Sequence, residues 1–321
     1  MKLTPPSVLL VLLVLAAFGA DRPPDTHVSS WEELKVYTGR GAYQKIEGQL
    51  RQKTYLAVYD GLQQLYGGTV DGQLHEEVVL LCPETADFLY SGFTPTEVDY
   101  RQGSRPVLEA KVREVTAGCT TERQKVLALL RNVRDLYQQP GDESLSSVLG
   151  GTEEQLLDAR PRWCELQSRL LVALCQVAGF PARRVGHFIG GHAVSEIYFE
   201  DRWAYIDIRG IYFLKPDGKF ASTWDIWTHP EWIELQDDEV KADRVRDGDP
   251  RLADIYRWES TLKRFFHPNE VTAIMNYNIS QAAKYNYRLV DRTKKPAVGQ
   301  AATPAHQEVG AWRDRIFAGE R

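Results

Sequence analysis

The fold is decided by the stretch "RPRWCELQSRLLVALCQVAGFPARRVGHFIGGHAVSEIYFEDRWAYIDIRG", residues 160–210, in which the hydrophobic period changes midway. In its first part, apolar residues recur at three- and four-residue steps, which is the spacing of one helix face and predicts a helix over residues 163–178. Gly179 and Pro181 end that helix, since glycine favours the position after a helix and proline cannot continue one. Beyond Pro181 the period falls to two, which predicts strands.

These strands include a tight hairpin. Residues 182–189 suit a first strand, and the residues that follow suit a hairpin with Glu200 and Asp201 at its tip. With a two-residue tip, His192 and Asp207 lie on one face of the sheet as diagonal neighbours, about 7–8 Å apart between backbones. An imidazole and a carboxylate at that separation can form a hydrogen bond. A one-residue change in the tip would place them on opposite faces.

The stretch holds two cysteines at different ends of the predicted helix. Cys164 is in the first turn and Cys175 in the last. Exposed backbone N–H groups and the positive end of the helix dipole lower a thiol pKa only at the N-terminus of a helix. We therefore predict that Cys164 can be a thiolate, whereas Cys175 belongs to the core.

A thiolate at a helix start, facing a histidine held by a carboxylate, is the arrangement that thiol acyl transfer needs. His192 would keep the thiolate charged and return a proton to the leaving amine, and Asp207 would fix the tautomer and stabilise the imidazolium. The backbone N–H of Cys164 is a candidate donor to an oxyanion. Gln138 and Gln139 are upstream candidates for a side-chain donor.

Residues 110–215 resemble the transglutaminase-like superfamily. The resemblance is carried by Cys164 opening a leucine-rich helix, by "VAGFPARRV" at its end, by His192 in "HAVSEIYF" and by Asp207 in "RWAYIDI". The helix "ERQKVLALLRNVRDLY" is similar to the element that precedes the cysteine in that family.

The resemblance implies an α+β fold with a papain-like core, in which the helix bearing the cysteine packs on an antiparallel sheet between helical N- and C-terminal segments. It implies Cys164 as nucleophile, His192 as general base and acid, and Asp207 as the residue that orients the histidine. The chemistry requires no cofactor; some relatives bind Ca²⁺, and that alternative stays open.

The first residues of the chain have the pattern of a secretory signal peptide. Lys2 precedes the unbroken apolar run "VLLVLLVLAAF", residues 8–18, which is too short to span a bilayer comfortably. We therefore expect a signal peptide over residues 1–20 and a secreted or periplasmic protein. An uncleaved N-terminal anchor is the alternative.

The rest of the chain divides into four expected parts. They are an N-terminal mainly helical segment at 21–105, a catalytic domain at 106–236, a C-terminal helical segment at 237–290 and a flexible tail at 291–321. Leu, Tyr and Ile at helical spacing indicate the first, and residues 269–289 suggest a helix in the third. The Pro, Ala, Gly and Thr content indicates the tail.

Composition excludes some classes of partner and site. A formal net charge of −5 in 321 residues gives no reason to expect nucleic acid or an anionic membrane as a partner. Four cysteines are too sparse for a disulfide scaffold, although Cys82 with Cys119 is a candidate pair and unpaired thiols are the alternative. A metal site formed by His187 with the three candidate residues matches no compact ligand motif.

Together these features predict a secreted thiol enzyme that acts on amide bonds of a protein or peptide through an acyl-enzyme. It would be a cysteine peptidase or amidase, a hydrolase, or a protein-glutamine acyltransferase, depending on whether water or an amine accepts the acyl group. The alternative is a catalytically inactive transglutaminase-like module that binds peptide or cell-wall polymer.

Two further sets of residues could bind substrate. Tryptophans could stack on a sugar or peptide, and arginines could bind a carboxylate of the substrate; these residues are Trp224, Trp227, Trp232, Arg183, Arg184 and Arg209. Core packing of the tryptophans and ordinary surface arginines are the alternatives.

Overall fold

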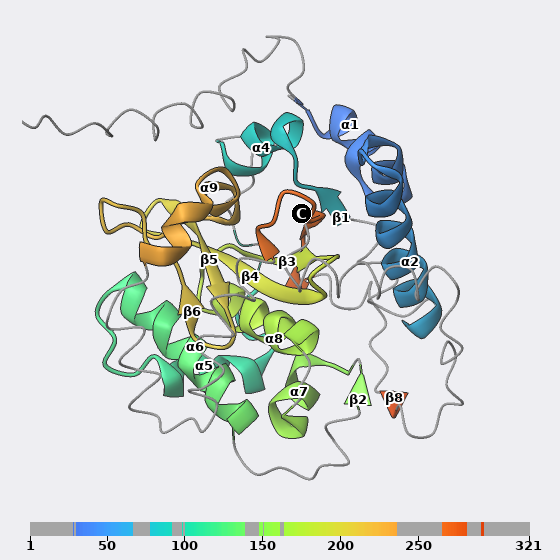
Figure 1. Ribbon diagram of the computed structural model, residues 1–321. Helices are drawn as coiled ribbons and strands as arrows, with labels where there is room; N and C mark the ends of the chain where they lie inside the picture. The colour runs from blue at the N-terminus through green and yellow to red at the C-terminus, as the bar shows by residue number, and fades with distance from the viewer. Residues whose placement is uncertain are drawn as a thin grey trace, which may run out of the picture.

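A six-stranded antiparallel sheet, in the order β1-β7-β3-β4-β5-β6, is the centre of the fold (Figure 1). The computed structural model describes residues 28, 30–66, 78–91, 98, 100–138, 148–149, 151–160, 164–235, 265–280 and 290–291. The six strands are β1 (Val78–Leu80), β3 (Ala182–His187), β4 (His192–Phe199), β5 (Arg202–Asp207), β6 (Ile211–Tyr212) and β7 (Thr272–Met275). A two-stranded sheet pairs β2 (Val148–Leu149) with β8 (Val290–Asp291).

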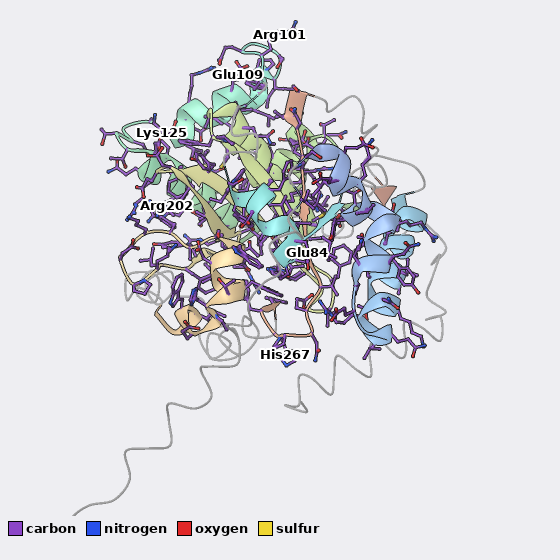
Figure 2. The ribbon with its side chains drawn as sticks, turned by 90° about the horizontal axis from the view of Figure 1, so that it is seen from above. Glu84, Arg101, Glu109, Lys125, Arg202 and His267 are labelled. Atoms are coloured by element: carbon purple, nitrogen blue, oxygen red, sulfur yellow. The ribbon has the colours of Figure 1, made fainter. Side chains whose placement is uncertain are left out.

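The hairpin of β4 and β5 has the tip and register predicted from the sequence. Both tip residues, Glu200 and Asp201, have positive φ values, 51° and 58°, which suit the right-handed twist of the flanking strands. The Glu200 carboxylate accepts from Arg123 Nε at 3.0 Å and from Arg123 Nη2 at 2.8 Å, which ties the tip to α6 (Glu122–Gln138). Arg202, which begins β5, lies at the periphery of the molecule (Figure 2).

The cysteine-bearing helix is α8 (Cys164–Val177), as predicted. It packs on β3 and β4, and α5 (Pro106–Val115), α6 and α7 (Glu153–Ala159) lie around it on the same face of the sheet (Figure 1). Gly179 ends the helix with a φ of 91°, and the next backbone N–H, that of Phe180, donates to the Cys175 carbonyl. A helix packed on an antiparallel sheet confirms the predicted α+β class.

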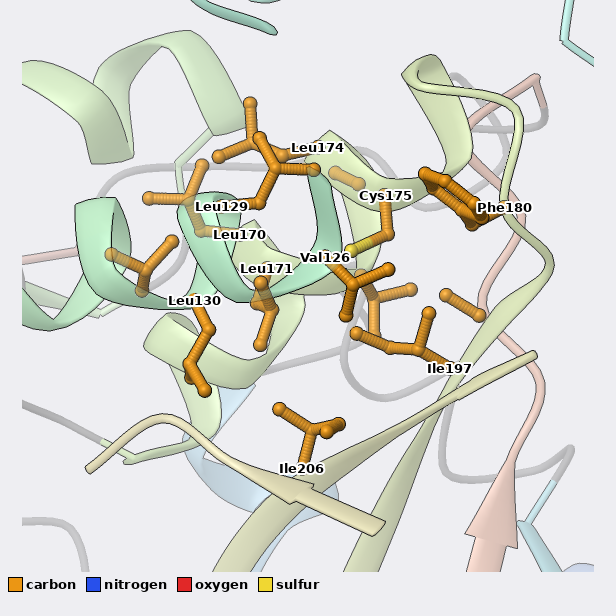
Figure 3. Packing of buried hydrophobic residues seen from close by; sticks show 14 of the residues in the cluster. Val126, Leu129, Leu130, Leu170, Leu171, Leu174, Cys175, Phe180, Ile197 and Ile206 are labelled. Atoms are coloured by element: carbon orange, nitrogen blue, oxygen red, sulfur yellow. The ribbon is translucent and has the colours of Figure 1, made fainter. Parts of the chain in front are cut away.

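The core between α8, α6 and the sheet is mainly aliphatic, with Phe180 near the end of α8 (Figure 3). Its buried members include Val126, Leu129, Leu130, Leu170, Leu171, Leu174, Ile197 and Ile206. Cys175 is fully buried among them, and burial raises the pKa of its thiol above the ordinary range. The prediction that Cys175 is a core residue is confirmed.

The other face of the sheet is covered by α4 (Pro83–Tyr90) and α9 (Thr223–Thr228), with α1 (Trp31–Leu34) nearby (Figure 1). The short 3₁₀ helices η1 (Lys35–Tyr37) and η2 (Gly39–Lys45) lead to α2 (Gln49–Tyr66), and η4 (Pro230–Leu235) follows α9. Buried side chains from both layers meet in this second core, among them Phe88, Leu89, Val185, Val194, Ile226 and Ile274. The sheet is therefore buried on both faces.

The helix expected over residues 269–289 is wrong in its first part, where β7 lies between β1 and β3. All four residues of β7 are buried, because a central strand covered on both faces carries a continuous apolar run. Such a run cannot be distinguished from a buried helix by its period. The signal peptide expected at residues 1–20 lies outside the described residues, as do residues 236–264 and the expected tail except for residue 291.

All four cysteines lie within the described residues and are free thiols. The candidate pair of Cys82 and Cys119 is therefore not bonded. Cys82 stands before α4, where its sulfur lies 3.6 Å from Thr85 Oγ1. In the part of the chain that the structure describes, no helix is both long and apolar enough to cross a membrane.

Candidate active site

Cys164 is the first residue of α8, so its thiol lies where the backbone N–H groups of a helix end are exposed. The thiol forms hydrogen bonds with the His192 imidazole and the Ala193 backbone N–H. Burial acts to raise the thiol pKa, but these hydrogen bonds and the charge of His192 outweigh it. The pKa of Cys164 is therefore lowered, which favours a thiolate.

His192 is the first residue of β4, and its side chain is 8% exposed. Its Nε2 lies 2.9 Å from Asp207 Oδ2, so Nδ1 is the ring nitrogen that remains for the thiol. Burial acts to lower the His192 pKa, but the Asp207 charge and the hydrogen bonds to Asp207 and Cys164 raise it above its ordinary value. The lowered thiol pKa and the raised imidazole pKa together favour a thiolate–imidazolium pair.

Asp207 is the last residue of β5 and is fully buried. Burial acts to raise its pKa, but the positive charges of Arg209 and His192 hold that pKa well below its usual range. The carboxylate is thus ionised and shared by two cationic partners. The predicted hydrogen bond between the diagonal neighbours His192 and Asp207 is confirmed.

Arg209 is a residue of the site whose position the sequence did not indicate. Its backbone N–H and its Nε donate to Asp207 Oδ1, both at 3.0 Å, and its Nη2 donates to Asp207 Oδ2. The same Nη2 lies 2.8 Å from His192 Nε2. Gly210, with a φ of 82°, turns the chain after β5, and its N–H donates to the Asp207 carbonyl. An arginine two residues after the aspartate, followed by glycine, is the signal that could have indicated this contact.

The arginines considered as carboxylate binders have partners inside the protein. Arg183 Nε donates to Glu196 Oε2 at 2.8 Å, and Arg184 Nη2 lies 3.2 Å from Glu165 Oε1. Both arginines are buried, and Arg209 binds Asp207. These side chains therefore stabilise the fold and the site from within.

His187 is the cross-strand partner of His192. It is buried, and burial lowers its pKa to about 3, so the imidazole is neutral near pH 7. Its Nδ1 lies 3.3 Å from Thr272 Oγ1. Within the described ranges no three His, Cys, Asp or Glu side chains form a group that could hold a metal ion.

The tryptophans lie in and after α9. Trp224 and Trp227 stack with ring centroids 5.1 Å apart, and Trp224 and Trp232 pack partly buried against the second core. Gln138 ends α6, and Gln139 lies outside the described residues.

Phe265 is a further residue of this site that the sequence did not indicate. Its ring stacks on that of His192, with centroids 5.0 Å apart and an interplanar angle of 22°. It precedes β7 and is more than fifty residues from Asp207 in sequence. No local pattern connects it with the histidine.

No curated protein and no solved structure matches the chain significantly. The model of the transglutaminase-like superfamily matches residues 109–208, which include α6, α8 and the strands β3 to β5. The matched range holds Cys164, His192 and Asp207, whereas Arg209 and Phe265 lie beyond it. This chain therefore carries a transglutaminase-like domain, with a cysteine-bearing helix packed on an antiparallel sheet.

Proposed function

We propose that this protein is a thiol enzyme that acts on amide bonds, with Cys164, His192 and Asp207 as its catalytic residues. The observation that carries the proposal is the continuous set of contacts from the Cys164 thiol through the His192 imidazole to the ionised Asp207. The opposite pKa shifts of Cys164 and His192 support a resting thiolate–imidazolium pair.

In the first step the Cys164 thiolate attacks the amide carbonyl carbon and forms a C–S bond. His192 then gives its proton to the leaving nitrogen as the C–N bond breaks, which releases an amine and leaves a thioester on Cys164. Asp207 stays ionised, holds the ring through Nε2 and stabilises the imidazolium. The backbone N–H of Cys164 at the start of α8 is the proposed donor to the oxyanion.

In the second step His192 takes a proton from the acceptor, which attacks the thioester carbon and releases Cys164. We propose water as the acceptor, because water is always present in excess, which makes the protein a peptidase or amidase acting on protein or peptide. A primary amine would make it a protein-glutamine acyltransferase. Mass spectrometry of a peptide library with and without an added primary amine distinguishes them, since cleaved chains indicate hydrolysis and incorporated amine indicates transfer.

A catalytically inactive module that binds peptide or cell-wall polymer is the competing function. Iodoacetamide reacts with thiolates, so an enzyme of this kind should be alkylated at Cys164 near pH 6 faster than a model thiol. Cys82 is a control within the chain, because burial raises its pKa to about 12. If Cys164 reacts no faster than the model thiol and Cys164→Ala changes no activity, the enzyme proposal fails.

We also propose that the protein is exported. The apolar run at residues 8–18 after Lys2 supports this. N-terminal sequencing of the protein from its native host tests it: a mature chain that begins near residue 21 agrees with export, and a chain that begins at residue 1 in the cytosolic fraction contradicts it.

A further inference from the structure

The segment of residues 265–270 lies directly before β7 and contacts the turn that joins β3 to β4. Its first two residues, Phe265 and Phe266, are buried, whereas His267 lies at the edge of the molecule (Figure 2). The turn ends at His192, so the contacts that hold this turn also fix the backbone position of His192. The segment lies outside the range matched by the family model.

Phe265 contacts the His192 ring directly. Besides its 5.0 Å stacking on His192, its ring stacks on His187 at 5.3 Å and 23°, so one aromatic ring contacts both imidazoles. The close approach depends on Gly190: a Cβ there would lie 2.1 Å from Phe265 Cδ1. A side chain at position 190 would therefore displace the ring from His192.

Glu270 holds the turn itself. Its carboxyl oxygens accept from the backbone N–H groups of Ile189 and Gly190, both at 2.8 Å, and from that of Val271 at 3.0 Å, and burial raises its pKa to about 8. Glu270 is 1% exposed, so these N–H groups have a buried partner in place of water. Arg51 of α2 donates to the Glu270 carbonyl at 3.0 Å and ties the segment to the N-terminal helices.

We propose that Phe265 and Glu270 are positioning residues for His192, a role that rests on the proposed function. The Phe265 ring covers one face of the imidazole and excludes water from it, which strengthens the hydrogen bond to Asp207 in a medium of low dielectric constant. A flat ring also favours an imidazolium on its face. Glu270 fixes the position of the turn that precedes His192 through its hydrogen bonds to Ile189 and Gly190. Among the described residues, Cys164, Asp207 and Arg209 act on the charge of His192, the neighbouring His187 is neutral near pH 7, and burial raises the pKa of Glu270 at the turn to about 8.

The test compares two adjacent phenylalanines. Phe265→Leu keeps an apolar side chain but removes the ring on His192, so we expect kcat for peptide cleavage to fall about 10- to 100-fold with KM nearly unchanged, the usual cost of a misplaced catalytic group. Alkylation of Cys164 at pH 6 should slow in parallel, because the thiolate depends on the imidazolium. The control is Phe266→Leu, since the Phe266 ring packs on His187, Tyr205 and Phe213. We expect it to keep the wild-type kcat and alkylation rate.

Two further variants test the same role through other contacts of the turn. Gly190→Ala should lower kcat in the wild type and have a much smaller effect in the Phe265→Leu background, because both changes act through one ring. Glu270→Gln should lower kcat at unchanged KM, since an amide NH₂ cannot accept from backbone N–H groups.

The outcomes separate the two proposals. Equal losses in Phe265→Leu and Phe266→Leu, or additive losses in the double variant, would overturn the positioning role while wild-type activity stands. A wild-type protein whose Cys164 is neither rapidly alkylated nor required for cleavage would instead remove the proposed function.

Discussion

At the residue scale, the basicity of His192 is set by two opposing charges. Burial lowers its pKa, the Asp207 carboxylate raises it, and the Arg209 guanidinium lowers it again. The same guanidinium lowers the pKa of Asp207 and so keeps this carboxylate ionised. The two variants that remove these charges should therefore shift the pH profile in opposite directions.

Asp207→Asn should lower kcat by about 10²- to 10⁴-fold, because the imidazole loses the partner that fixes its tautomer and stabilises its charge. Removing the carboxylate also removes a contribution that raises the His192 pKa. The alkaline limb of kcat/KM, which reports loss of the imidazolium proton, should move to lower pH. A pH series of peptide cleavage measures both effects, and an unchanged alkaline limb would contradict the assignment.

Arg209→Met should move the same alkaline limb to higher pH. The Arg209 charge lowers the pKa of His192, so the imidazolium keeps its proton to a higher pH once that charge is gone. Arg202→Met, at the periphery of β5, is the control and should leave the limb in place. The same pH series measures it; a shift to lower pH would show that Arg209 acts on His192 mainly through orientation.

At the scale of elements, α8 places two thiols at its ends in unlike surroundings. Cys164 contacts His192 at the helix start, whereas Cys175 is enclosed by the core near the helix end. The sequence could predict this difference because the helix period and its C-terminal Gly179 are local features. Replacing Cys164 should therefore affect mainly reactivity, and replacing Cys175 should affect mainly the free energy of unfolding.

Cys175→Ser should lower the free energy of unfolding by about 1–3 kcal/mol, because it buries a hydroxyl where the thiol had apolar neighbours. Cys164→Ser should change that free energy by less than about 1 kcal/mol and abolish alkylation at this position. Urea unfolding of both variants gives the comparison. A larger stability loss for Cys164→Ser would mean that its thiol is mainly structural.

The β4–β5 hairpin was predictable and β7 was not, for physical reasons. Two residues at the tip with alternating strands on either side fix the register, and register alone determines that His192 and Asp207 share a face. The strand at Thr272–Met275 has no alternation, because both of its faces are covered. Its identity depends on β1 and β3, which are distant in sequence.

At the scale of the whole molecule, a buried carboxylate connects parts of the chain that are far apart. Glu153 of α7 accepts from Arg105 Nη2 at 2.7 Å and from the Tyr277 hydroxyl at 2.5 Å, and Arg169 Nε of α8 lies 3.6 Å away. Glu153 and Arg169 are fully buried. Tyr277, which lies two residues beyond β7, is thereby hydrogen-bonded to the helical layer.

Glu153→Ala should destabilise the protein by about 3–5 kcal/mol, because it removes a buried carboxylate that contacts two arginines and the Tyr277 hydroxyl. Glu154→Ala is the matched control: Glu154 also pairs with Arg105 but is 28% exposed, so its loss should cost about 1 kcal/mol or less. Denaturant unfolding of the two variants measures the difference. Equal losses would mean that burial of the charge is not the deciding factor.

The sequence by itself determined the cysteine-bearing helix, its end at Gly179, the hairpin with its tip, and the pairing of His192 with Asp207, since each follows from spacing within a few tens of residues. Only the tertiary structure decided that Arg209 turns back onto Asp207, that β7 enters the centre of the sheet, and that Phe265 covers the His192 ring. The reason is that period and turn chemistry are local, whereas these contacts depend on surfaces that exist only after distant segments have packed together.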